Sequence, residues 1–523
     1  MPSPSSRAAL AAQLPHWSAW RNNTASSWWR DPGLRRCMFN IFCLYGSVFA
    51  YGYDGALISS IQAQPSWVLK FNNPTGITLG NLSSSYLYPQ LPFPFLGSFL
   101  ADRYGRKPVM FIASVLGIVG PIISCFGDSV GSFIAGRIIT GISAAFYMTV
   151  APALVAEVAH PRFRHSAQGS YYSMYFIGSF VCGWAGYGCV SWNSNWSWRV
   201  LTLLQFLGCF PLLISTLTTW QVESPRWLVK KGRREHALKA LADLHANGDQ
   251  NDELVLNELN EIVAAVELEE SVIPAGFMDF FKTPGNRKRL ASVVWFAWAL
   301  SMSGNNLLAY YTPVILVSIG FTSSLKIQAI LAGNSAWGLL CALTGAQLLE
   351  RLGRRTLLLW GSVATIVSFA IFTGTTAGFV VSGNLGAANG ALAFLFIFAG
   401  CFIIWGFPLP YTYVPEILPY QLRVKGMAIY GITTNAGALY NSLVNPVALE
   451  AIGWRYYCMF AGLLVIQTVI AYFLIMETKG LTLEDIAVLF DGADAHIAPA
   501  LQDKSSVHGE EKLEEARYEA EHV

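Results

Sequence analysis

The chain has 523 residues, of which 53% are hydrophobic and only 13% are charged, and its formal net charge is +2. Soluble domains usually carry about 25% charged residues, and the mean hydropathy of this chain is +0.42. These values exclude a disordered protein, a coiled coil and an ordinary soluble enzyme, and they predict a polytopic membrane protein. The nine cysteines include no Cys-x-x-Cys pair, and we interpret them as buried apolar residues, with no disulfide framework and no metal site.

Twelve apolar runs of about 20 residues are long enough to cross roughly 30 Å of hydrocarbon. The first 38 residues are polar and basic and lack the features of a signal peptide, so the first run is expected to stay as a helix. The runs lie at about 39–59, 84–101, 108–126, 129–151, 168–190, 200–220, 290–312, 325–348, 356–377, 390–411, 424–447 and 455–476.

We therefore predict an all-α membrane protein with 12 transmembrane helices in two pseudo-symmetric six-helix bundles. A polar stretch with helical spacing of leucine and valine separates the two bundles and predicts a cytoplasmic helical insertion. The expected parts are an N-terminal segment (1–38), the first bundle (39–220), the insertion (221–289), the second bundle (290–476) and an acidic cytoplasmic tail (477–523), disordered from about residue 491.

The short loops on one side of the predicted membrane contain ten basic residues, and those on the other side, with their helix ends, contain four. The side with more Lys and Arg is normally cytoplasmic, so both termini are predicted to be in the cytosol. The sequons at Asn81 and Asn195 then face outward as candidate glycosylation sites.

The two predicted bundles contain the same short motifs in the same order. Residues 102–107 (DRYGRK) recur as 350–355 (ERLGRR), and the pair Glu157 and Arg164 recurs as Glu416 and Arg423. The dipeptide Trp-Arg at 198–199 recurs at 454–455. Such a duplication fits a transporter whose substrate binds between two halves that rock about it.

These motifs resemble those of the major facilitator superfamily, and within it those of the sugar porter family. Residues 222–228 (VESPRWL) resemble the family motif P-E-S-P-R-W-L after helix 6, and 477–484 (ETKGLTLE) resemble its P-E-T-K-G-x-[ST]-L-E after helix 12. The sequences of helices 7 and 10 look most similar to the fungal lactose-permease-like branch. The resemblance covers about residues 40–490 and implies the fold and alternating-access transport of that family.

Two charged residues lie inside predicted spans. Asp54 is about 22 Å from the inner end of the first helix, and Arg137 is roughly 12 Å from the outer end of the fourth, which places both at similar depth. A lone charge at such a depth costs about 2.5–3.5 kcal/mol, so we expect the two to pair. The resemblance implies that Asp54 carries the coupled proton and that Arg137 modulates the pKa of Asp54. The alternative is a static ion pair that fixes helix packing.

A second set of charges lies at the predicted cytoplasmic helix ends. The resemblance implies a gating network that holds the cytoplasmic side closed in the outward-facing state, and the alternative is that these residues only set the topology. The network consists of Asp102, Arg106, Glu157, Arg164, Glu223, Arg226, Glu350, Arg354, Glu416, Arg423 and Glu477.

The expected substrate site departs from that of hexose carriers. Helix 7 keeps the family's Asn306 and Tyr310 but has Leu300 and Ser301 in place of two glutamines, and Tyr172 replaces a glutamine in helix 5. Fewer amides and more aromatic rings suggest a ligand that is larger or has fewer hydroxyl groups than glucose. The candidate substrate-binding residues are Tyr51, Tyr172, Ser301, Asn305, Asn306, Tyr310, Tyr411 and Asn435.

The sequence thus predicts a carrier in a membrane, with the plasma membrane as the default, that moves a sugar or sugar-like polyol together with protons. The alternatives are a carrier or exporter of a fungal specialised metabolite and, with less support, a sugar sensor that does not transport. No enzyme activity, cofactor or metal is expected, since the chain has no P-loop and no nucleophile or metal constellation. The expected partners are the small-molecule substrate, protons and the lipid bilayer, with no nucleic acid.

Overall fold

The computed structural model of the chain describes residues 20–25, 27–218, 220–271, 276–479, 486 and 489–491. All regular structure in these ranges is helical, with no strand. Each of the twelve expected apolar runs corresponds to one helix or to two consecutive helices. Within the described part, eight helical stretches are long and apolar enough to cross a membrane, and the other four expected spans lie in interrupted or more polar helices.

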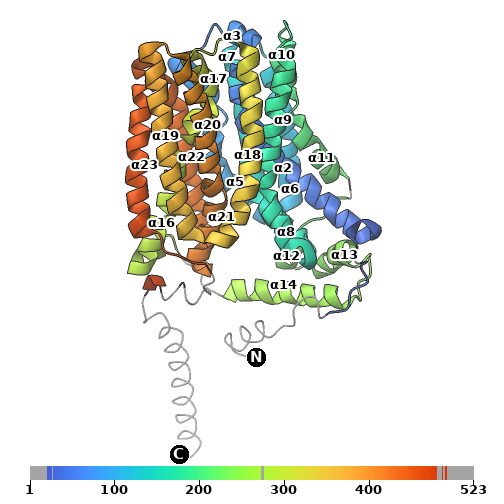
Figure 1. Cartoon of the computed structure of the whole chain (residues 1–523). Coiled ribbons are helices and arrows are strands. Elements are labelled where there is room, and N and C mark those ends of the chain that lie inside the picture. Colours follow the sequence, from blue (N-terminus) through green and yellow to red (C-terminus); the bar gives the residue numbers. More distant parts are fainter. Residues whose placement is uncertain are drawn as a thin grey trace, which may run out of the picture.

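The first bundle contains the helices from α2 to α11 (Figure 1). Several of its spans are interrupted, and the helices that make it are α2 (Pro32–Gln62), α3 (Pro65–Lys70), α4 (Gly76–Ser84), the 3-10 turn η3 (Tyr88–Gln90), α5 (Phe93–Tyr104), α6 (Arg106–Phe126), α7 (Val130–Val158), α8 (Pro161–Tyr171), α9 (Ser173–Cys189), α10 (Trp196–Leu203) and α11 (Phe206–Leu217). A 3-10 turn, η2 (Trp28–Arg30), precedes α2.

The second bundle stands beside the first (Figure 1). Its helices are α16 (Pro284–Ser301), α17 (Asn305–Ser318), α18 (Ser324–Leu352), α19 (Arg354–Ser382), α20 (Leu385–Gly406), α21 (Pro408–Ile417), α22 (Tyr420–Ile452) and α23 (Arg455–Leu474). Gly304 separates α16 from α17 and has a φ of +83°, a left-handed conformation in which a side chain would also contact the ring of Phe369. This break interrupts the helix in the middle of an expected span, as in carriers whose binding sites use discontinuous helices.

The first helix begins earlier than the expected boundary at residue 39. Asp31 caps it by accepting a hydrogen bond from the Leu34 N–H at 2.9 Å, and Pro32 occupies the first helical position. Both features favour a helix start at this point, because they satisfy a free amide and preset the backbone. The basic residues of the expected N-terminal segment, Arg35 and Arg36, therefore lie on the first turns of α2.

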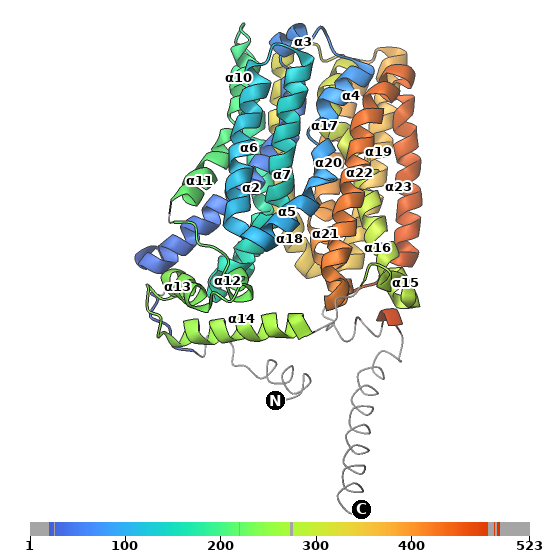
Figure 2. The ribbon, with the colours of Figure 1, turned by 180° about the vertical axis from the view of Figure 1, so that it is seen from behind.

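Four short helices cover the face of the molecule that is lowest in Figure 1, here called the lower face, and the opposite end is the upper face. They are α12 (Pro225–Lys230), α13 (Arg234–His245), α14 (Glu253–Ser271) and α15 (Asp279–Lys282). Figure 2 shows α14 lying across the lower face, with α12 and α13 between it and the first bundle. They fall within the stretch 221–289, where an insertion was expected.

The expected acidic tail does not separate from the second bundle at residue 477. Phe490 and Ile486 are each only 4% exposed and pack in the apolar core of that bundle. Asp491 binds the Arg289 guanidinium with both oxygens, at 3.1 and 2.8 Å. The boundary predicted at 476 is therefore too early, because a hydrophobic pair and an ion pair extend the fold. The disorder predicted beyond residue 491 lies outside the described residues.

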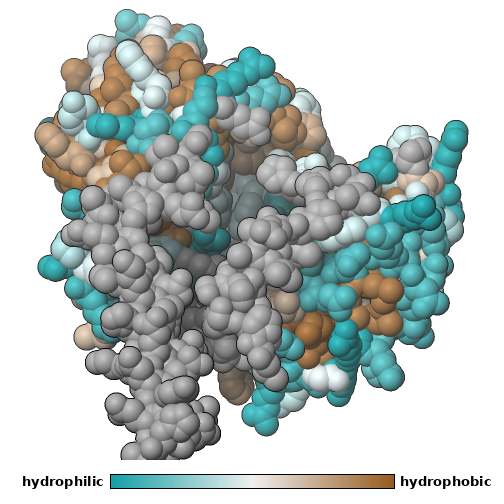
Figure 3. All heavy atoms as spheres, turned by 90° about the horizontal axis from the view of Figure 1, so that it is seen from below, coloured by the Kyte–Doolittle hydropathy of each residue, from teal (hydrophilic) through white to brown (hydrophobic). Residues whose placement is uncertain are grey.

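The two bundles touch along their upper and middle parts. The contacts are made by α4 with α22, α9 with α18, and α2 with α17. On the upper face the Thr75 hydroxyl lies 3.5 Å from Glu450, and in the middle the Ser179 and Ser335 hydroxyls lie 3.5 Å apart. Seen from below, the molecule is hollowed between the two bundles (Figure 3). The structure is thus closed above and open below.

Candidate functional site

Asp54 and Arg137 form an ion pair in the interior of the first bundle. Asp54 is on α2 and Arg137 is on α7, and their side chains are 2% and 3% exposed. Arg137 Nη1 donates a hydrogen bond to Asp54 Oδ1. The two charges are therefore taken out of solvent together, which relieves most of the cost that either would have alone.

Three polar atoms around this pair have no hydrogen-bond partner among the described residues: Asp54 Oδ2, Arg137 Nε and the Tyr86 hydroxyl. The Arg137 guanidinium carbon lies 5.0 Å from the centre of the Tyr86 ring. Buried polar groups are normally satisfied, and each one left without a partner costs about 1–3 kcal/mol. The arrangement is therefore suited to water or to hydroxyl groups of a ligand.

A cavity of about 40 Å³ adjoins these atoms. It has room for a few water molecules, but it is smaller than a sugar as it stands. It is lined by Tyr51, Asp54, Gly55, Ser83, Tyr86, Leu87, Arg137, Tyr175 and Tyr310. Tyr310 belongs to the second bundle and the other lining residues to the first, so the cavity lies between the two.

The sequence identified two of the tyrosines that line the cavity, Tyr51 and Tyr310, and missed Tyr86 and Tyr175. Tyr51 is 6.2 Å from Tyr86 and 5.9 Å from Tyr175, measured between ring centroids. Tyr175 had a signal in the sequence, because it lies three residues after Tyr172 and therefore on the same face of a helix. Tyr86 lies in the turn between α4 and η3, where no helical spacing connects it to the other tyrosines.

Tyr172 and Tyr411 are stacked, with ring centroids 4.3 Å apart, and they come from opposite bundles. They are 36% and 39% exposed, whereas Asp54 is buried. Tyr175, beside Tyr172 on α9, connects this stack to the cavity through its contact with Tyr51. The stacked pair thus lies between the buried cavity and solvent, where a ligand that entered from below would meet it.

The expected amides of the second bundle take different positions. Asn435 donates a hydrogen bond to the Gln90 carbonyl in the first bundle at 3.3 Å. Asn305 and Asn306 follow the break at Gly304, and Asn306 makes one contact of 3.4 Å with the Ser301 carbonyl. Ser301 is 1% exposed and its hydroxyl donates to backbone carbonyls of α16 and α22. None of these four residues lines the cavity.

In the first bundle, Arg106 is the centre of the lower-face charges. Its guanidinium lies 3.6 Å from Glu157 and 3.4 Å from Asp102, and its backbone N–H donates to Glu223 at 2.8 Å. Glu223 also accepts from the backbone N–H of Lys107 at 3.1 Å. One end of α6 is thereby fixed to α7 and to the segment before α12.

The second bundle repeats this arrangement with a tighter ion pair. Arg354 binds Glu416 through two nitrogens, at 2.6 and 3.2 Å, and Thr478 donates to the same carboxylate at 2.8 Å. Glu477 accepts the backbone N–H groups of Arg354 and Arg355 at 2.8 and 3.0 Å. Glu477 therefore takes the position that Glu223 has in the first bundle.

The remaining members of the expected gating network have other surroundings. Arg164 on α8 pairs with Glu258 on α14 and so joins the first bundle to the insertion. Arg226 is on α12 of the insertion and pairs with Glu269 on α14, within the insertion. Arg423 Nε has no hydrogen-bond partner in the described part of the chain, and the side chain of Glu350 lies outside the described residues. Every lower-face ion pair recorded for the described residues lies within one bundle, lies within the insertion, or joins the first bundle to the insertion.

Arg164 and Glu258 belong to a buried cluster that the sequence did not reveal. Burial alone would lower the pKa of His245, but the Glu258 carboxylate, 2.7 Å from its Nδ1, raises it to about 10. Burial would likewise raise the pKa of Glu258, but His245 and Arg164 lower it to about 2. Burial, with the nearby positive His245, lowers the pKa of His160 to about 3. At neutral pH the cluster therefore holds a charged His245–Glu258 pair beside a neutral His160.

The two sequons differ in accessibility. Asn195 is exposed at the upper end of the first bundle, before α10. Asn81 is partly buried on α4, where its side-chain Oδ1 accepts a hydrogen bond from the Tyr88 hydroxyl at 3.1 Å. No group of His, Cys, Asp and Glu residues among those described is arranged to hold a metal ion.

A protein-family model described as "Sugar (and other) transporter" matches residues 39–490. The chain belongs to this sugar porter family. It is therefore a multi-pass membrane transporter of the major facilitator superfamily and not an enzyme. The matched range extends past residue 476, in agreement with the docking of Ile486 and Phe490 on the second bundle.

Similar proteins include fungal and bacterial carriers. The chain is 28% identical over 469 residues to a high-affinity glucose transporter of Kluyveromyces lactis, a match that covers 85% of this chain and 83% of that protein. It is also 28% identical over 452 residues to the MFS-type transporter criB of Aspergillus cristatus, with 85% and 91% covered.

The fold matches that of solved sugar transporters. The inward-open xylose transporter XylE of Escherichia coli aligns with a TM-score of 0.70 and 20% identity, over 87% of this chain and 99% of that one. The proton:xylose symporter XylE bound to 6-bromo-6-deoxy-D-glucose aligns with a TM-score of 0.67. The expected all-helical fold of this superfamily is thereby confirmed.

Proposed function

We propose that this protein is a secondary active carrier that moves a sugar or sugar-like polyol together with protons by alternating access. The observation that carries the proposal is the cavity between the bundles, with three unpartnered polar atoms around a buried Asp54–Arg137 pair. A carboxylate that exchanges its arginine partner for a proton can couple proton binding to a change between two conformations. Similar carriers include a glucose transporter and a proton:xylose symporter, which supports this substrate class.

In this proposal the substrate enters the hollow between the bundles, displaces the Tyr172–Tyr411 stack and reaches the cavity. Tyrosine rings contact the C–H faces of the substrate, and the Tyr51, Tyr310 and Tyr86 hydroxyls exchange hydrogen bonds with its hydroxyls. Asp54 accepts a proton and Arg137 is then free to bind the substrate or water. The lower-face networks about Arg106 and Arg354 are separate from each other in this structure, each within its own bundle. In the outward-facing state the two networks meet across the bundles.

A second candidate is a carrier, including an exporter, of a fungal specialised metabolite. It is favoured by the cavity lining, in which four tyrosines and no Asn or Gln were found. Such a surface suits a larger, flatter and less hydroxylated ligand than a hexose. The proposal of a sugar carrier has three further parts. We propose that the protein belongs to the fungal lactose-permease-like branch, that it lies in the plasma membrane and that it is glycosylated at Asn195.

Counterflow in liposomes separates the two candidates without the need for a proton gradient. Purified protein is reconstituted into vesicles loaded with one unlabelled sugar, and entry of the labelled form is followed for a panel of mono- and disaccharides and polyols. We expect counterflow for at least one of these compounds and none in empty vesicles. Absence of counterflow for every compound, from protein that unfolds cooperatively, would favour the specialised-metabolite carrier.

A further inference from the structure

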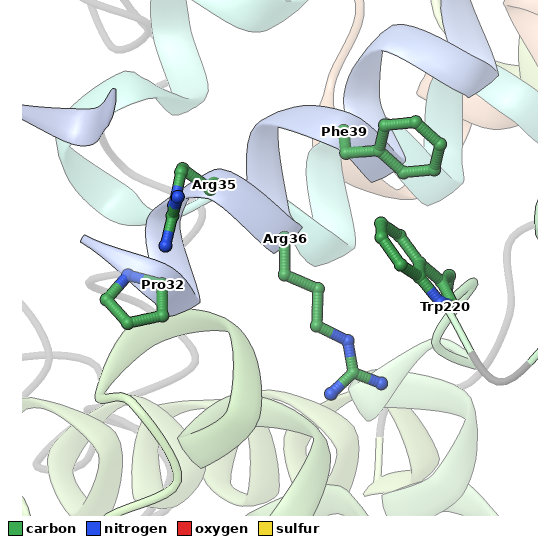
Figure 4. A pocket seen from close by; sticks show the side chains of 5 residues that line it. All are labelled: Pro32, Arg35, Arg36, Phe39 and Trp220. Carbon is green, nitrogen blue, oxygen red and sulfur yellow. The ribbon is translucent and has the colours of Figure 1, made fainter. Parts of the chain in front are cut away.

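A second and larger cavity opens on the side of the molecule, near the lower face, where α2 begins. It has a volume of about 570 Å³ and is lined by Pro32, Arg35, Arg36, Phe39 and Trp220 (Figure 4). It is remote from the cavity between the bundles, because it lies at the first turns of α2, whereas Asp54 is on the sixth turn or beyond. Neither transport nor gating, as described above, uses it.

One wall of this side cavity is aromatic. The Phe39 and Trp220 rings contact each other edge to face, with centroids 5.0 Å apart, and are 38% and 52% exposed. Beyond them, Phe42 on α2 and Leu217 on α11 are 62% and 66% exposed. In a membrane protein such exposed apolar side chains face the acyl chains, so the cavity lies where the hydrocarbon surface ends. Aromatic residues commonly mark this level of the bilayer.

The other wall is basic. The exposed Arg35 has no ion-pair partner in the described part of the chain, and Arg36 forms a half-exposed pair with Asp243 at 3.2 Å. The Lys107 ammonium binds the Thr218 carbonyl at 3.1 Å and is close enough to Arg36 for the two charges to repel. The first backbone amides of α2 are already bonded, Gly33 to Asn247 and Leu34 to Asp31. An anion here would therefore bind to side chains and not to the helix terminus.

The repeated half of the chain lacks a counterpart of Phe39. The start of α2, Pro32-Gly33-Leu34-Arg35-Arg36, recurs 252 residues later at the start of α16 as Pro284-Gly285-Asn286-Arg287-Lys288. The position of Phe39 is then occupied by Ala291. The basic residues are thus present at both helix starts, but α16 has no aromatic residue at the position of Phe39.

We propose that this side cavity binds the head group of an anionic phospholipid. The planar guanidinium of Arg35 is suited to two parallel hydrogen bonds with a phosphate, Arg36 adds positive charge, and the Phe39–Trp220 wall continues into the surface that contacts acyl chains. A free phosphate would satisfy the arginines but would leave the aromatic wall unused. A lipid satisfies both walls, and anionic lipids are concentrated in the cytoplasmic leaflet, which is where the basic loops place this face.

Native mass spectrometry of the purified full-length protein tests this proposal without any transport assay. Short-chain phosphatidylserine, short-chain phosphatidylcholine and inorganic phosphate are titrated separately, and the apparent Kd of the first bound molecule is measured. We expect phosphatidylserine to bind at least about five-fold more tightly than phosphatidylcholine. We also expect inorganic phosphate at the same concentration not to displace it, and displacement would show a site for free anions and overturn the proposal.

Variants locate the bound lipid. Arg35→Gln and Trp220→Leu are each expected to weaken phosphatidylserine binding about five-fold, whereas Arg287→Gln removes the equivalent arginine of α16 and should leave it unchanged. Arg35→Lys keeps the charge but not the planar fork, so its loss should be smaller than that of Arg35→Gln. Unchanged binding to Arg35→Gln, or an equal loss in Arg287→Gln, would contradict the proposal. Both arginines are exposed, so all variants are expected to fold.

Discussion

At the scale of single residues, the site is defined by what the Asp54–Arg137 pair leaves unsatisfied. One carboxylate oxygen and one guanidinium nitrogen remain without partners, and a tyrosine hydroxyl beside them is also free of hydrogen bonds within the described chain. A purely structural ion pair is expected to satisfy its remaining atoms, since unpaired buried groups cost stability. The unsatisfied atoms therefore favour a role for the pair in binding over a role in packing alone.

The substitution Asp54→Asn tests proton coupling at this pair. Asn keeps the size of the side chain but has no proton to exchange, so we expect uphill uptake to be lost while counterflow of the same substrate persists. Uptake into liposomes with an inward proton gradient measures the first, and counterflow without a gradient measures the second. Asp128→Asn, at an exposed carboxylate paired with Lys70, is the control. Accumulation by Asp54→Asn equal to that of the unmodified protein would contradict the assignment.

The adjacent tyrosines Tyr310 and Tyr311 allow a matched test of substrate binding. Tyr310 lines the cavity and its hydroxyl makes no hydrogen bond in the described structure, whereas the Tyr311 hydroxyl donates to the Ser442 carbonyl. Loss of one hydrogen bond to substrate costs about 1 kcal/mol, so Tyr310→Phe should raise KM about five-fold. Tyr311→Phe should leave KM unchanged, and the opposite pattern would place the substrate elsewhere.

At the scale of helices and their connections, much of the fold could be predicted from the sequence and some of the contacts could not. The depth of Asp54 and Arg137 followed from counting residues along two helices, and the repeated motifs at Arg106 and Arg354 followed from internal comparison. The partner of Arg164 could not be found in this way, because Glu258 lies 94 residues away on α14 and only the docking of that helix brings them together. The early start of α2 had a local signal, because Asp31 before Pro32 is a typical helix start. The helix was instead predicted to begin at residue 39, where the apolar run begins.

The His245–Glu258 pair predicts how the stability of the insertion depends on pH. The pKa of His245 is raised from 6.5 to about 10, so its contribution is complete below pH 6.5 and is lost as pH rises through about 10. The pKa of Glu258 is lowered from 4.5 to about 2, so its contribution is complete above pH 4.5 and is lost as pH falls through about 2. We expect the contact between α13, α14 and the first bundle to weaken steadily from pH 7 to pH 10.

Limited proteolysis of the α13–α14 segment across this pH range is the measurement. Glu258→Gln leaves His245 and Arg164 without their carboxylate, and loss of one partner of a buried pair costs about 3–5 kcal/mol. We therefore expect rapid cleavage of this variant already at pH 6.5. Glu253→Gln, on the exposed side of the same helix, should behave like the unmodified protein. Equal cleavage of the two variants would mean that the pair does not hold the insertion in place.

At the scale of the whole molecule, the two bundles meet above and separate below, so this is one end state of a rocking motion. The sequence predicted two related bundles from its repeats, but it did not indicate which ends touch. That depends on contacts such as Thr75 with Glu450 on the upper face and Ser179 with Ser335 in the middle, between residues 375 and 156 positions apart. Transport by alternating access requires these contacts to open. Each lower-face network would then meet its counterpart in the other bundle.

A disulfide between Ser179→Cys and Ser335→Cys tests this motion. The two hydroxyl oxygens lie 3.5 Å apart, so the two sulfurs need only a small side-chain movement to reach the disulfide bond length of about 2.0 Å. We expect oxidation of the double variant to stop substrate counterflow and a reducing agent to restore it, while the Ser179→Cys single variant is insensitive to both treatments. Undiminished counterflow by protein shown to be crosslinked would contradict a motion that opens this contact.

Accumulation of substrate driven by a proton gradient tests proton symport by this protein directly. Purified protein in liposomes is given an inward proton gradient together with a sugar that passes the counterflow test, and internal sugar is measured with and without a protonophore. We expect sugar to accumulate above its external concentration and the protonophore to abolish the excess. Uptake that stops at the external concentration, whatever the gradient, would show a facilitator and contradict proton symport through Asp54 and Arg137.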